Sequence, residues 1–451
     1  MPNPHRENKL QQPAWKYYQT KIQRIKALKR SFRAILTCFF LSLILFFAGY
    51  QIFDGHEAAS DRSPDKTAAA APPALQDNNE NTARSITKRE VRQLLQGKSF
   101  LNLDEKDFIY HHNGQQLKVT TSLDMPLQRY MLKKMDMSHA RVMGFVAMDP
   151  TTGQILSMIG QDKTDPKKNP CVDGIFPAAS IFKIVTAAAA VEKMGIVPDS
   201  TFFFNGKKHT LYKNQINKQK TKYTHQTTFK DSFAQSVNPV FGKIGALSLG
   251  KAVLENYAEV FGFNRNIDFE IPLLPSVISI SEDLYNLAEI ASGFNRATQI
   301  SPLHGALLAS IPLNQGALMA PTIIERIVDE KFQTVYLSRK NQLNHAISPA
   351  ASKIVARLML NTITNGTGKK GFRRYKTDRV LSNLTIGGKT GSIGDKTNEA
   401  RFDWFVGFAQ DKKGGKKIAV SVLVIHEKYI GVKAIRYARM AIQQYFRNDA
   451  L

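Results

Sequence analysis

Apolar residues alternate with a period of two in two separate parts of the chain. From Val142 the stretch VMGFVAMDPTTGQILSMIG contains two apolar runs joined by a Asp-Pro-Thr-Thr-Gly turn at residues 149–153, which predicts a β-hairpin. Much later, FDWFVGFAQ and KKIAVSVLVIH flank a turn at residues 411–415 and predict a second pair of strands. Early and late strands of this kind predict one antiparallel sheet, completed by both ends of the folded chain.

Helical spacing dominates the middle, from about residue 180 to residue 360. The clearest segment is SIFKIVTAAAAVEKMG, which is rich in alanine and should end as a helix at Gly195. VKAIRYARMAIQQYF, near the C-terminus, also repeats apolar residues at helical intervals. Strands at both ends and helices between them predict an α/β fold of the α+β type, with helices packed on the sheet.

Twenty consecutive residues, 34–53, carry no charge. At about 1.5 Å per residue a helix of this length crosses the roughly 30 Å of bilayer hydrocarbon, so the segment predicts a single transmembrane signal anchor. Residues 1–33 hold nine basic residues against the single acid Glu7, which predicts a cytoplasmic N-terminal tail and an extracytoplasmic, periplasmic-side remainder. A cleaved signal peptide is the alternative, but its apolar stretch would be shorter and no A-x-A site follows Phe53.

The rest of the chain divides by composition. Residues 54–85 contain AAAAPPA and DNNENTA with few large apolar residues, and they predict a flexible linker. Residues 86–138 combine helical spacing at Val91, Leu94 and Leu95 with a strand-like LKVTTSLD, and they predict a small membrane-proximal region. Residues 139–451 then form the main domain.

Composition and charge narrow the function classes. With 43% hydrophobic residues among 451, wholesale disorder is excluded, and the formal charge of +25 suggests an anionic partner. Outside a cytoplasmic membrane the anions are phospholipid and cell-wall polymer, so no nucleic-acid partner is expected; a solvated basic face without any partner fits equally well. Cys38 and Cys171 are the only cysteines, lie in different compartments and cannot pair, and no metal or cofactor site is expected.

Three short motifs carry candidate chemistry. Ser180 and Lys183 form S-x-x-K at the start of the alanine-rich helix, where a separation of three residues puts hydroxyl and amine on one face. Serine is a weak nucleophile, and a desolvated lysine among other cations can lose its proton and act as its base. Alone, the pattern is more typical of an exposed helix start capped by serine.

The other two motifs lie far along the chain. Ser236-Val237-Asn238 places a hydroxyl and an amide at a loop or helix start, and residues 387–392 have the sequence GGKTGS. The paired glycines allow close approach of another backbone, and Lys389 supplies a fixed cation beside the hydroxyl of Thr390, an arrangement suited to carboxylate recognition.

Together and in this order, S-x-x-K, S-x-N and K-T-G resemble the penicillin-binding protein and serine β-lactamase superfamily. VTTSLDMPLQ, GFVAMDPTTGQILSMIG, ISPLHGALLASIPLNQGALMAP and FDWFVGFAQ look like the transpeptidase domain of penicillin-binding proteins, over roughly residues 118 to 447. The resemblance implies that residues 139–451 form that domain, with a five-stranded antiparallel sheet covered by helices and an all-helical subdomain. The exported chain before Val142 is too short for a glycosyltransferase domain, so a monofunctional member is expected.

The resemblance also implies a function, that of a peptidoglycan D,D-transpeptidase that binds β-lactams covalently. Its substrates would be stem peptides ending in D-Ala-D-Ala, and other cell-wall synthesis proteins are possible partners. Ser180 would attack the penultimate alanine's carbonyl, Lys183 would take the proton, and Ser236, held by Asn238, would relay one to the departing D-alanine.

The implied binding groups come mainly from the third motif. Lys389 and Thr390 would bind the terminal carboxylate, with Gly391 beside them, and the backbone N–H groups of Ser180 and Ser392 would form the oxyanion hole. One departure is that Pro177-Ala178-Ala179 precedes Ser180, where the family often has proline-glycine, so the turn into the catalytic helix is less permissive.

Several alternatives follow from the same residues. A D,D-carboxypeptidase or β-lactamase would share every step until water replaces the amine acceptor; Glu282 begins a segment similar to the E-x-x-L-N of class A β-lactamases, with tyrosine in place of the leucine. A non-catalytic cell-wall scaffold or β-lactam sensor is a third possibility. Residues 206–230 hold seven lysines and no acid and could overhang the cleft, and GTGKKG at 366–371 suggests a flexible basic loop.

Overall fold

The structure is a computed structural model that describes residues 86–217, 219–395, 397 and 399–447. The chain separates into the units Met1–Asn79 and Glu80–Leu451, and every described residue belongs to the second. The predicted tail (1–33), anchor (34–53) and linker (54–85) therefore lie outside the described residues. Among those that are described, no helix is both long enough and apolar enough to span a bilayer.

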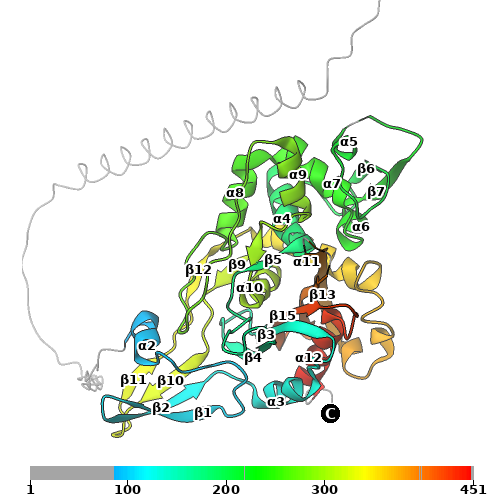
Figure 1. The fold of residues 1–451 in the computed structure, drawn as a ribbon. Coiled ribbons are helices and arrows are strands. Elements are labelled where there is room, and N and C mark those ends of the chain that lie inside the picture. Colours follow the sequence, from blue (N-terminus) through cyan, green and yellow to red (C-terminus); the bar gives the residue numbers. More distant parts are fainter. Residues whose placement is uncertain (1–85, 218, 396, 398, 448–451) are drawn as a thin grey trace, which may run out of the picture. The chain divides into compact units, whose positions relative to one another are not determined.

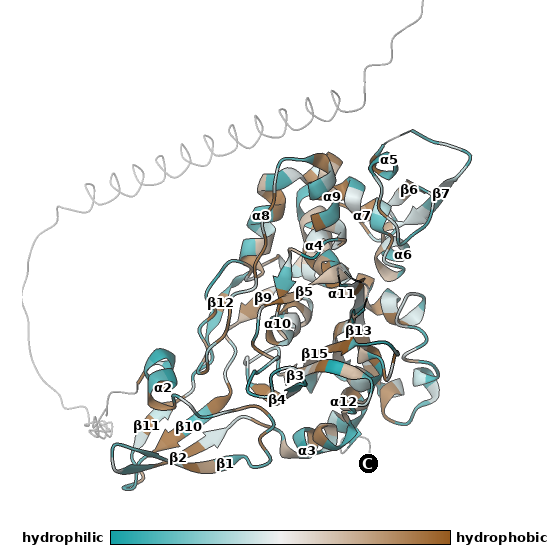
Figure 2. Ribbon diagram, viewed as in Figure 1, coloured by the Kyte–Doolittle hydropathy of each residue, from teal (hydrophilic) through white to brown (hydrophobic). Residues whose placement is uncertain are grey.

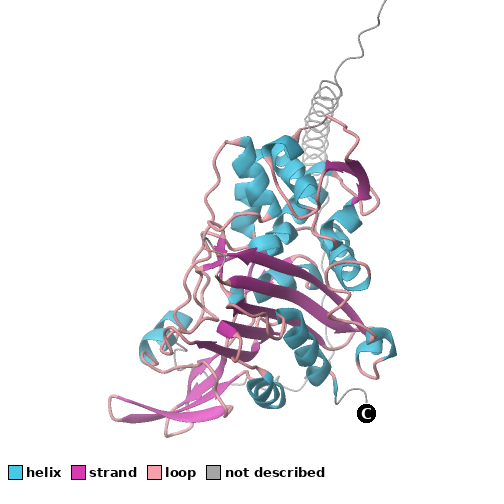
Figure 3. Cartoon of the chain, turned by 45° about the vertical axis from the view of Figure 1, so that its right-hand side comes forward, coloured by secondary structure: helices cyan, strands magenta, loops and turns pink. Residues whose placement is uncertain are grey.

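A five-stranded antiparallel sheet with the order β13-β14-β15-β3-β4 is the centre of the fold (Figures 1 and 3). Its strands are β3 (Ala140–Met148), β4 (Ile155–Asp162), β13 (Leu384–Gly394), β14 (Arg401–Asp411) and β15 (Lys417–His426). Both predicted hairpins are confirmed, as β3-β4 and β14-β15. Because β15 pairs with β3, the early and late hairpins join into one sheet, as the alternation predicted.

Helices cover both faces of this sheet. α12 (Ala434–Tyr445) and α3 (Met125–Lys134) pack on one face, and α10 (Pro302–Leu313) packs on the other. A strand covered on both sides must be apolar throughout, and β15 is buried at every position after Lys417. α10 is likewise buried along its whole length up to Pro312, and Figure 2 shows hydrophobic residues gathered around these central elements.

The remaining helices form a largely helical region next to β13. They are α4 (Lys183–Met194), α6 (Phe229–Ala234), α7 (Asn238–Ile244), α8 (Gly250–Val260), α9 (Leu284–Ser292) and α11 (Pro349–Thr364), with a π-helical turn at Gly245–Leu249. A hairpin, β6 (Thr201–Asn205) and β7 (Thr224–Thr228), encloses the short α5 (Lys213–Ile216). The alanine-rich segment is α4, preceded by a 3-10 turn at Ala179–Phe182, and it stops at Gly195, whose φ is 63°.

A second sheet lies beyond the first, with the order β1-β2-β10-β11. It combines β1 (Asp107–His112) and β2 (Gln115–Thr121) with β10 (Ile324–Val328) and β11 (Thr334–Leu337), and α2 (Lys88–Leu94) packs nearby (Figure 1). This sheet crosses the boundary expected at residue 138, because β2 belongs to the small region and β10 to the main domain. Two short pairs, β5 (Phe176–Pro177) with β8 (Gln299–Ile300) and β9 (Ala317–Met319) with β12 (Gln342–His345), complete the strands of the described residues.

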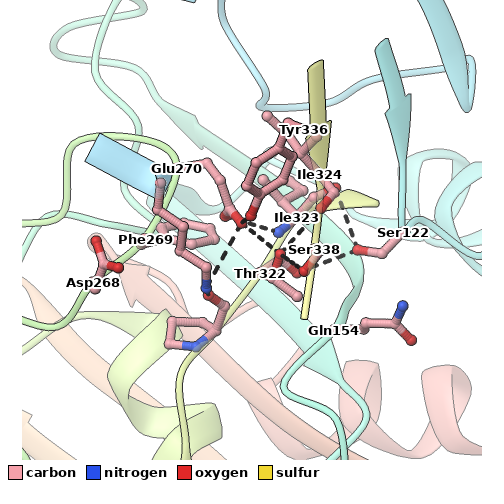
Figure 4. A network of polar contacts seen from close by, with 12 residues as sticks. Ser122, Gln154, Asp268, Phe269, Glu270, Thr322, Ile323, Ile324, Tyr336 and Ser338 are labelled. Carbon is pink, nitrogen blue, oxygen red and sulfur yellow. Dashed lines mark hydrogen bonds and ion pairs between the residues drawn. The ribbon is translucent and has the colours of Figure 1, made fainter. Parts of the chain in front are cut away.

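A buried carboxylate connects these parts. Glu270 is 1% exposed and accepts hydrogen bonds from the Tyr336 hydroxyl (2.9 Å), the Ile323 backbone N–H (3.1 Å) and the Thr322 hydroxyl (Figure 4). The ammonium of Lys88 in α2 lies 3.7 Å from the same carboxylate. Burial and this carboxylate raise the pKa of Tyr336, so its hydroxyl keeps its proton and donates it. The network therefore fastens α2 to the second sheet and to the loop at residues 268–271.

Candidate active site

The turn that carries Ser180 is held in an unusual backbone conformation. Ala179 has φ 49°, in the left-handed region that favours glycine, so the Ala-Ala departure from proline-glycine places a strained residue just before the serine. Two neighbours fix it: the Trp404 indole N–H donates to Pro177 O at 2.9 Å, and Gly293 packs so closely that a Cβ there would lie 1.9 Å from Ala179 O. The turn is therefore set by tertiary contacts.

Lys183 lies directly beneath Ser180 and is completely buried. Its Nζ is 2.9 Å from Ser180 Oγ and 2.8 Å from Asn238 Oδ1, and it also donates to Ser292 O. A neutral lysine amine has two protons and one lone pair. If Asn238 Oδ1 and Ser292 O accept the two protons, the lone pair faces the Ser180 hydroxyl. Burial first, and the charge of Lys389 second, lower the pKa of Lys183 well below the ordinary lysine value.

The second motif begins α7 and also contains a strained residue. Ser236 has φ 56° and is 7% exposed, and Asn238 is 5% exposed. One amide proton of Asn238 goes to the backbone oxygen of His209 at 3.0 Å, while its Oδ1 accepts from Lys183. Asn238 is thereby oriented, with one amide proton left for another acceptor.

The third motif occupies the free edge of the sheet, on β13. Lys389 is fully buried, and its Nζ donates to Ser236 Oγ at 3.0 Å and to Thr390 O at 2.9 Å. Burial lowers the pKa of Lys389 to about 7. A Cβ on Gly391 would lie 3.2 Å from the Ile181 side chain, so this glycine lets the strand approach the catalytic turn.

The paired glycines that precede Lys389 have a different use from the one expected. Cβ atoms at Gly387 and Gly388 would lie 2.5 Å from the Phe408 ring and 2.4 Å from the Phe405 ring. The glycines therefore make room for aromatic rings of β14 and do not serve an incoming backbone.

The three motifs meet at one cleft of about 550 Å³. Of the predicted site residues, six line this cleft: Ser180, Ser236, Asn238, Thr390, Gly391 and Ser392. The other two, Lys183 and Lys389, lie behind it with their amines bonded to the serine hydroxyls. The structure thus brings all eight together, although 209 positions separate Ser180 from Lys389 in the sequence.

Other groups at this cleft were not found from the sequence. The Ser292 carbonyl holds Lys183, Gly293 makes room for the Ala179 turn, and Thr367 lies 2.5 Å from Thr390, hydroxyl to hydroxyl. A backbone carbonyl leaves no signature in a sequence, so Ser292 could not be identified. Thr367 did have a signal, the GTG of residues 366–368, where a basic loop was expected. The segment is an irregular turn whose Thr367 N–H donates to Ala234 O at 3.0 Å, and its flexibility stays a prediction.

Glu282 and the basic segment at residues 206–230 were also candidates, and only the second lies near the cleft. Glu282 is exposed and does not line it; the next residue, Asp283, caps α9 by accepting from Asn286 N–H at 2.8 Å. The basic segment at residues 206–230 does approach the cleft, because His209 lines the cleft and the Lys208 carbonyl accepts from Asn238 N–H at 2.7 Å.

The arrangement provides the parts of nucleophilic acyl transfer. A partly exposed hydroxyl contacts a buried amine of lowered pKa, and a second hydroxyl contacts a second buried amine across the cleft. Residues 143–443, about two thirds of the chain, match the family model of the penicillin binding protein transpeptidase domain. The chain belongs to this family.

Curated relatives of this penicillin-binding protein are distant. Stage V sporulation protein D of Bacillus subtilis (strain 168) is 24% identical over 326 residues, covering 67% of this chain and 49% of that protein. The peptidoglycan D,D-transpeptidase PbpA of Mycolicibacterium smegmatis is 24% identical over 315 residues, covering 62% of this chain and 61% of that protein. The chain thus spans about half to three fifths of the length of these relatives.

Solved structures share the fold of this penicillin-binding protein. The D,D-transpeptidase domain of a peptidoglycan glycosyltransferase from Eggerthella lenta superposes with a TM-score of 0.60 at 23% identity, covering 73% of this chain and 83% of that one. Penicillin-binding protein A from M. tuberculosis, as an imipenem acyl-enzyme complex, gives 0.59 at 19% identity, covering 72% and 79%. These likenesses agree with the α/β architecture and its antiparallel sheet.

Proposed function

We propose that this penicillin-binding protein is a D,D-transpeptidase that cross-links peptidoglycan stem peptides ending in D-Ala-D-Ala through an ester on Ser180. The observation that carries the proposal is the environment of Lys183. Its amine is dry, has a lowered pKa, and gives two protons to neutral oxygens while its third position meets the Ser180 hydroxyl. Relatives named as peptidoglycan D,D-transpeptidases support the same reaction.

In the first half-reaction Ser180 Oγ attacks the carbonyl carbon of the penultimate D-alanine and its proton passes to Lys183 Nζ. Backbone N–H groups of Ser180 and Ser392 stabilise the oxyanion. As the tetrahedral intermediate breaks, the departing D-alanine nitrogen takes a proton from Ser236, which is reprotonated by the ammonium of Lys389 at 3.0 Å. The terminal carboxylate is bound by Lys389 and the Thr390 hydroxyl until the amino acid leaves.

The second half-reaction reverses these transfers. An amine from a second stem peptide attacks the ester carbonyl and gives its proton through Ser236 to Lys389. Ser180 Oγ recovers its proton from Lys183 as the new amide forms. A pKa of about 7 suits Lys389 to both duties, because it can give and take a proton at neutral pH.

Fluorescent penicillin tests the proposal. The fragment from residue 86 onward should be labelled covalently and keep its label for hours, whereas Ser180→Ala should not be labelled. Rapid loss of the label would instead indicate a β-lactamase, in which water replaces the amine, although Glu282 is exposed and outside the cleft. An unlabelled wild-type protein would favour the non-catalytic scaffold.

We also propose that residues 34–53 anchor the protein in the cytoplasmic membrane, with residues 1–33 inside and the folded domain outside. The uncharged segment and the basic residues before it support this orientation. Protease added to intact spheroplasts should digest the folded domain. Protection of that domain until the cells are lysed would contradict the proposal.

A further inference from the structure

The segment that follows α11 folds back against the second motif. Thr367 N–H donates to Ala234 O at 3.0 Å, and Gly368 N–H donates to Thr362 O at 3.0 Å. Gly366 packs so closely on α6 that a Cβ there would lie 2.2 Å from Ala234 O. The backbone of Thr367 is therefore held against Ala234, which lies two residues before Ser236, the first residue of the second motif.

The Thr367 side chain points from this segment into the third motif. Its Oγ1 lies 2.5 Å from the Oγ1 of Thr390, and both residues line the cleft. Thr390 is the hydroxyl assigned above to the substrate carboxylate. Within the part of the chain that the structure describes, the Thr390 hydroxyl makes no other hydrogen bond.

Either hydroxyl can donate along this contact, and the acceptors available to each one decide the direction when a substrate is bound. The other acceptor near Thr367 Oγ1 is Ala234 O, at a longer 3.3 Å, and that oxygen already accepts the Thr367 backbone N–H. A carboxylate in the cleft is a stronger acceptor than either of these neutral oxygens, so Thr390 donates to the carboxylate and no longer to Thr367. Thr367 then donates to Thr390 Oγ1 along the 2.5 Å contact.

We propose that Thr367 is a positioning residue for carboxylate recognition: its hydroxyl donates to Thr390 Oγ1 and so directs the Thr390 proton at the terminal carboxylate of the acyl donor. The inference rests on the proposed function and adds to it a residue outside the three motifs. An unpartnered hydroxyl rotates among several orientations, whereas one that accepts a bond at a fixed angle has its proton restricted. A chain of two hydroxyls ending on a carboxylate also polarises each bond and strengthens it.

The test compares benzylpenicillin, which has a carboxylate, with its methyl ester, which has none. Thr367→Val removes the hydroxyl at nearly constant volume, and Thr367→Ser keeps it. For Thr367→Val, the ratio of the acylation rate constants for the acid and the ester should fall about tenfold or more, the change expected when a bond to a charged group weakens. Thr367→Ser should restore most of the wild-type ratio, and Thr390→Val should lower it at least as far.

Thr364→Val is the matched control. Thr364 lies three residues earlier, at the end of α11, and its hydroxyl bonds to Leu360 O in its own helix, at 3.3 Å. This variant should keep the wild-type ratio. The double variant Thr367→Val, Thr390→Val should show no lower ratio than Thr390→Val alone, because Thr367 acts through Thr390.

Two results would overturn the inference while leaving the proposed function intact. If Thr367→Val slows the acid and the ester equally, Thr367 only supports the fold around the cleft. If the ratio is unchanged, the Thr390 proton is directed by another group. A wild-type protein that no penicillin acylates would overturn the proposed function, and this inference with it.

Discussion

Lysine amines are buried in two regions of this molecule, and their surroundings differ in one respect. Lys88, in α2, lies 3.7 Å from the carboxylate of Glu270. Lys183, below the cleft, contacts the Ser180 hydroxyl and two carbonyl-type oxygens, and no carboxylate among the described residues forms an ion pair with it. A carboxylate stabilises a buried ammonium. Neutral acceptors do not replace the hydration energy that the ammonium loses on burial, so they leave the charged form destabilised.

The difference separates a structural use of lysine from a chemical one. At Lys88 the charge pair joins α2 to Glu270, whose polar network with Thr322, Ile323 and Tyr336 is drawn in Figure 4. At the cleft, burial lowers the pKa of both Lys183 and Lys389, and each amine contacts a serine hydroxyl. A carboxylate beside Lys183 would return its proton and remove the base. In the proposed mechanism, Lys183 can therefore act as a base because no described carboxylate pairs with it.

The largest expected effect comes from removing the cleft amine. Lys183→Met should slow acylation by penicillin by about 10²- to 10⁴-fold, the usual contribution of a general base. Its free energy of unfolding should change little, because losing a desolvated amine offsets the lost hydrogen bonds. Labelling kinetics and urea unfolding measure the two quantities. A variant that acylates within tenfold of the wild type would show that another group takes the Ser180 proton.

At Lys88 the opposite pattern is expected, a loss of stability with an unchanged acylation rate. Lys88→Met leaves the Glu270 carboxylate buried without its cation, which should lower the free energy of unfolding by about 3–5 kcal/mol. The acylation rate of the folded protein should be unchanged. The double variant Lys88→Met, Glu270→Gln removes the unpaired charge and should recover part of the loss in urea unfolding. Equal losses in the single and double variants would mean that packing of Lys88, not its charge, is what counts.

How much of this could be predicted depends on how local each signal is. The hairpins β3-β4 and β14-β15 follow from alternation and turn residues that are adjacent in the sequence, and α4 ends at a glycine suited to its left-handed cap. The second sheet has no such signal. β2 and β10 pair across about 200 residues, and β10 has only five residues, so their partnership is decided by packing.

The same contrast applies to the site. Side chains that carry the chemistry recur at fixed spacings, so S-x-x-K, S-x-N and K-T-G identified all eight predicted residues, which the structure gathers around one cleft. Groups that position those side chains could not be identified in this way. Ser292 contributes a backbone oxygen, Gly293 contributes the absence of a side chain, and Thr367 acts across the fold.

A buried histidine extends the comparison to stability. His304 in α10 is 1% exposed, and its Nε2 forms a hydrogen bond of 2.7 Å with the Phe261 carbonyl. Burial lowers the pKa of His304 from 6.5 to about 4. As the pH falls, the His304 ring therefore binds a proton near pH 6.5 in the unfolded chain but only near pH 4 in the folded chain. Stability is fully present above pH 6.5 and should fall by about 3 kcal/mol as the pH drops through this window.

Urea unfolding at pH 7 and pH 4.5 measures this effect against His304→Gln, which keeps a donor for Phe261 O but does not titrate. The wild type should lose more stability than the variant over that interval. Identical losses would indicate that the acid sensitivity comes from carboxylates elsewhere.

The smallest expected effect concerns Lys389, and it separates the two cleft amines from each other. In the proposed mechanism Lys183 must be neutral to accept a proton, whereas Lys389 must be charged to bind a carboxylate. With a pKa of about 7, Lys389 loses its charge as the pH rises, so the acylation rate constant of the free enzyme for an ionised penicillin should fall about tenfold between pH 8 and pH 9. In Lys389→Arg the guanidinium stays charged, so the alkaline fall should disappear even if the variant is slower at every pH. A wild-type profile that stays flat up to pH 9 would mean that Lys389 keeps its proton, and the cleft would then resemble the Lys88 region more closely than its contacts indicate.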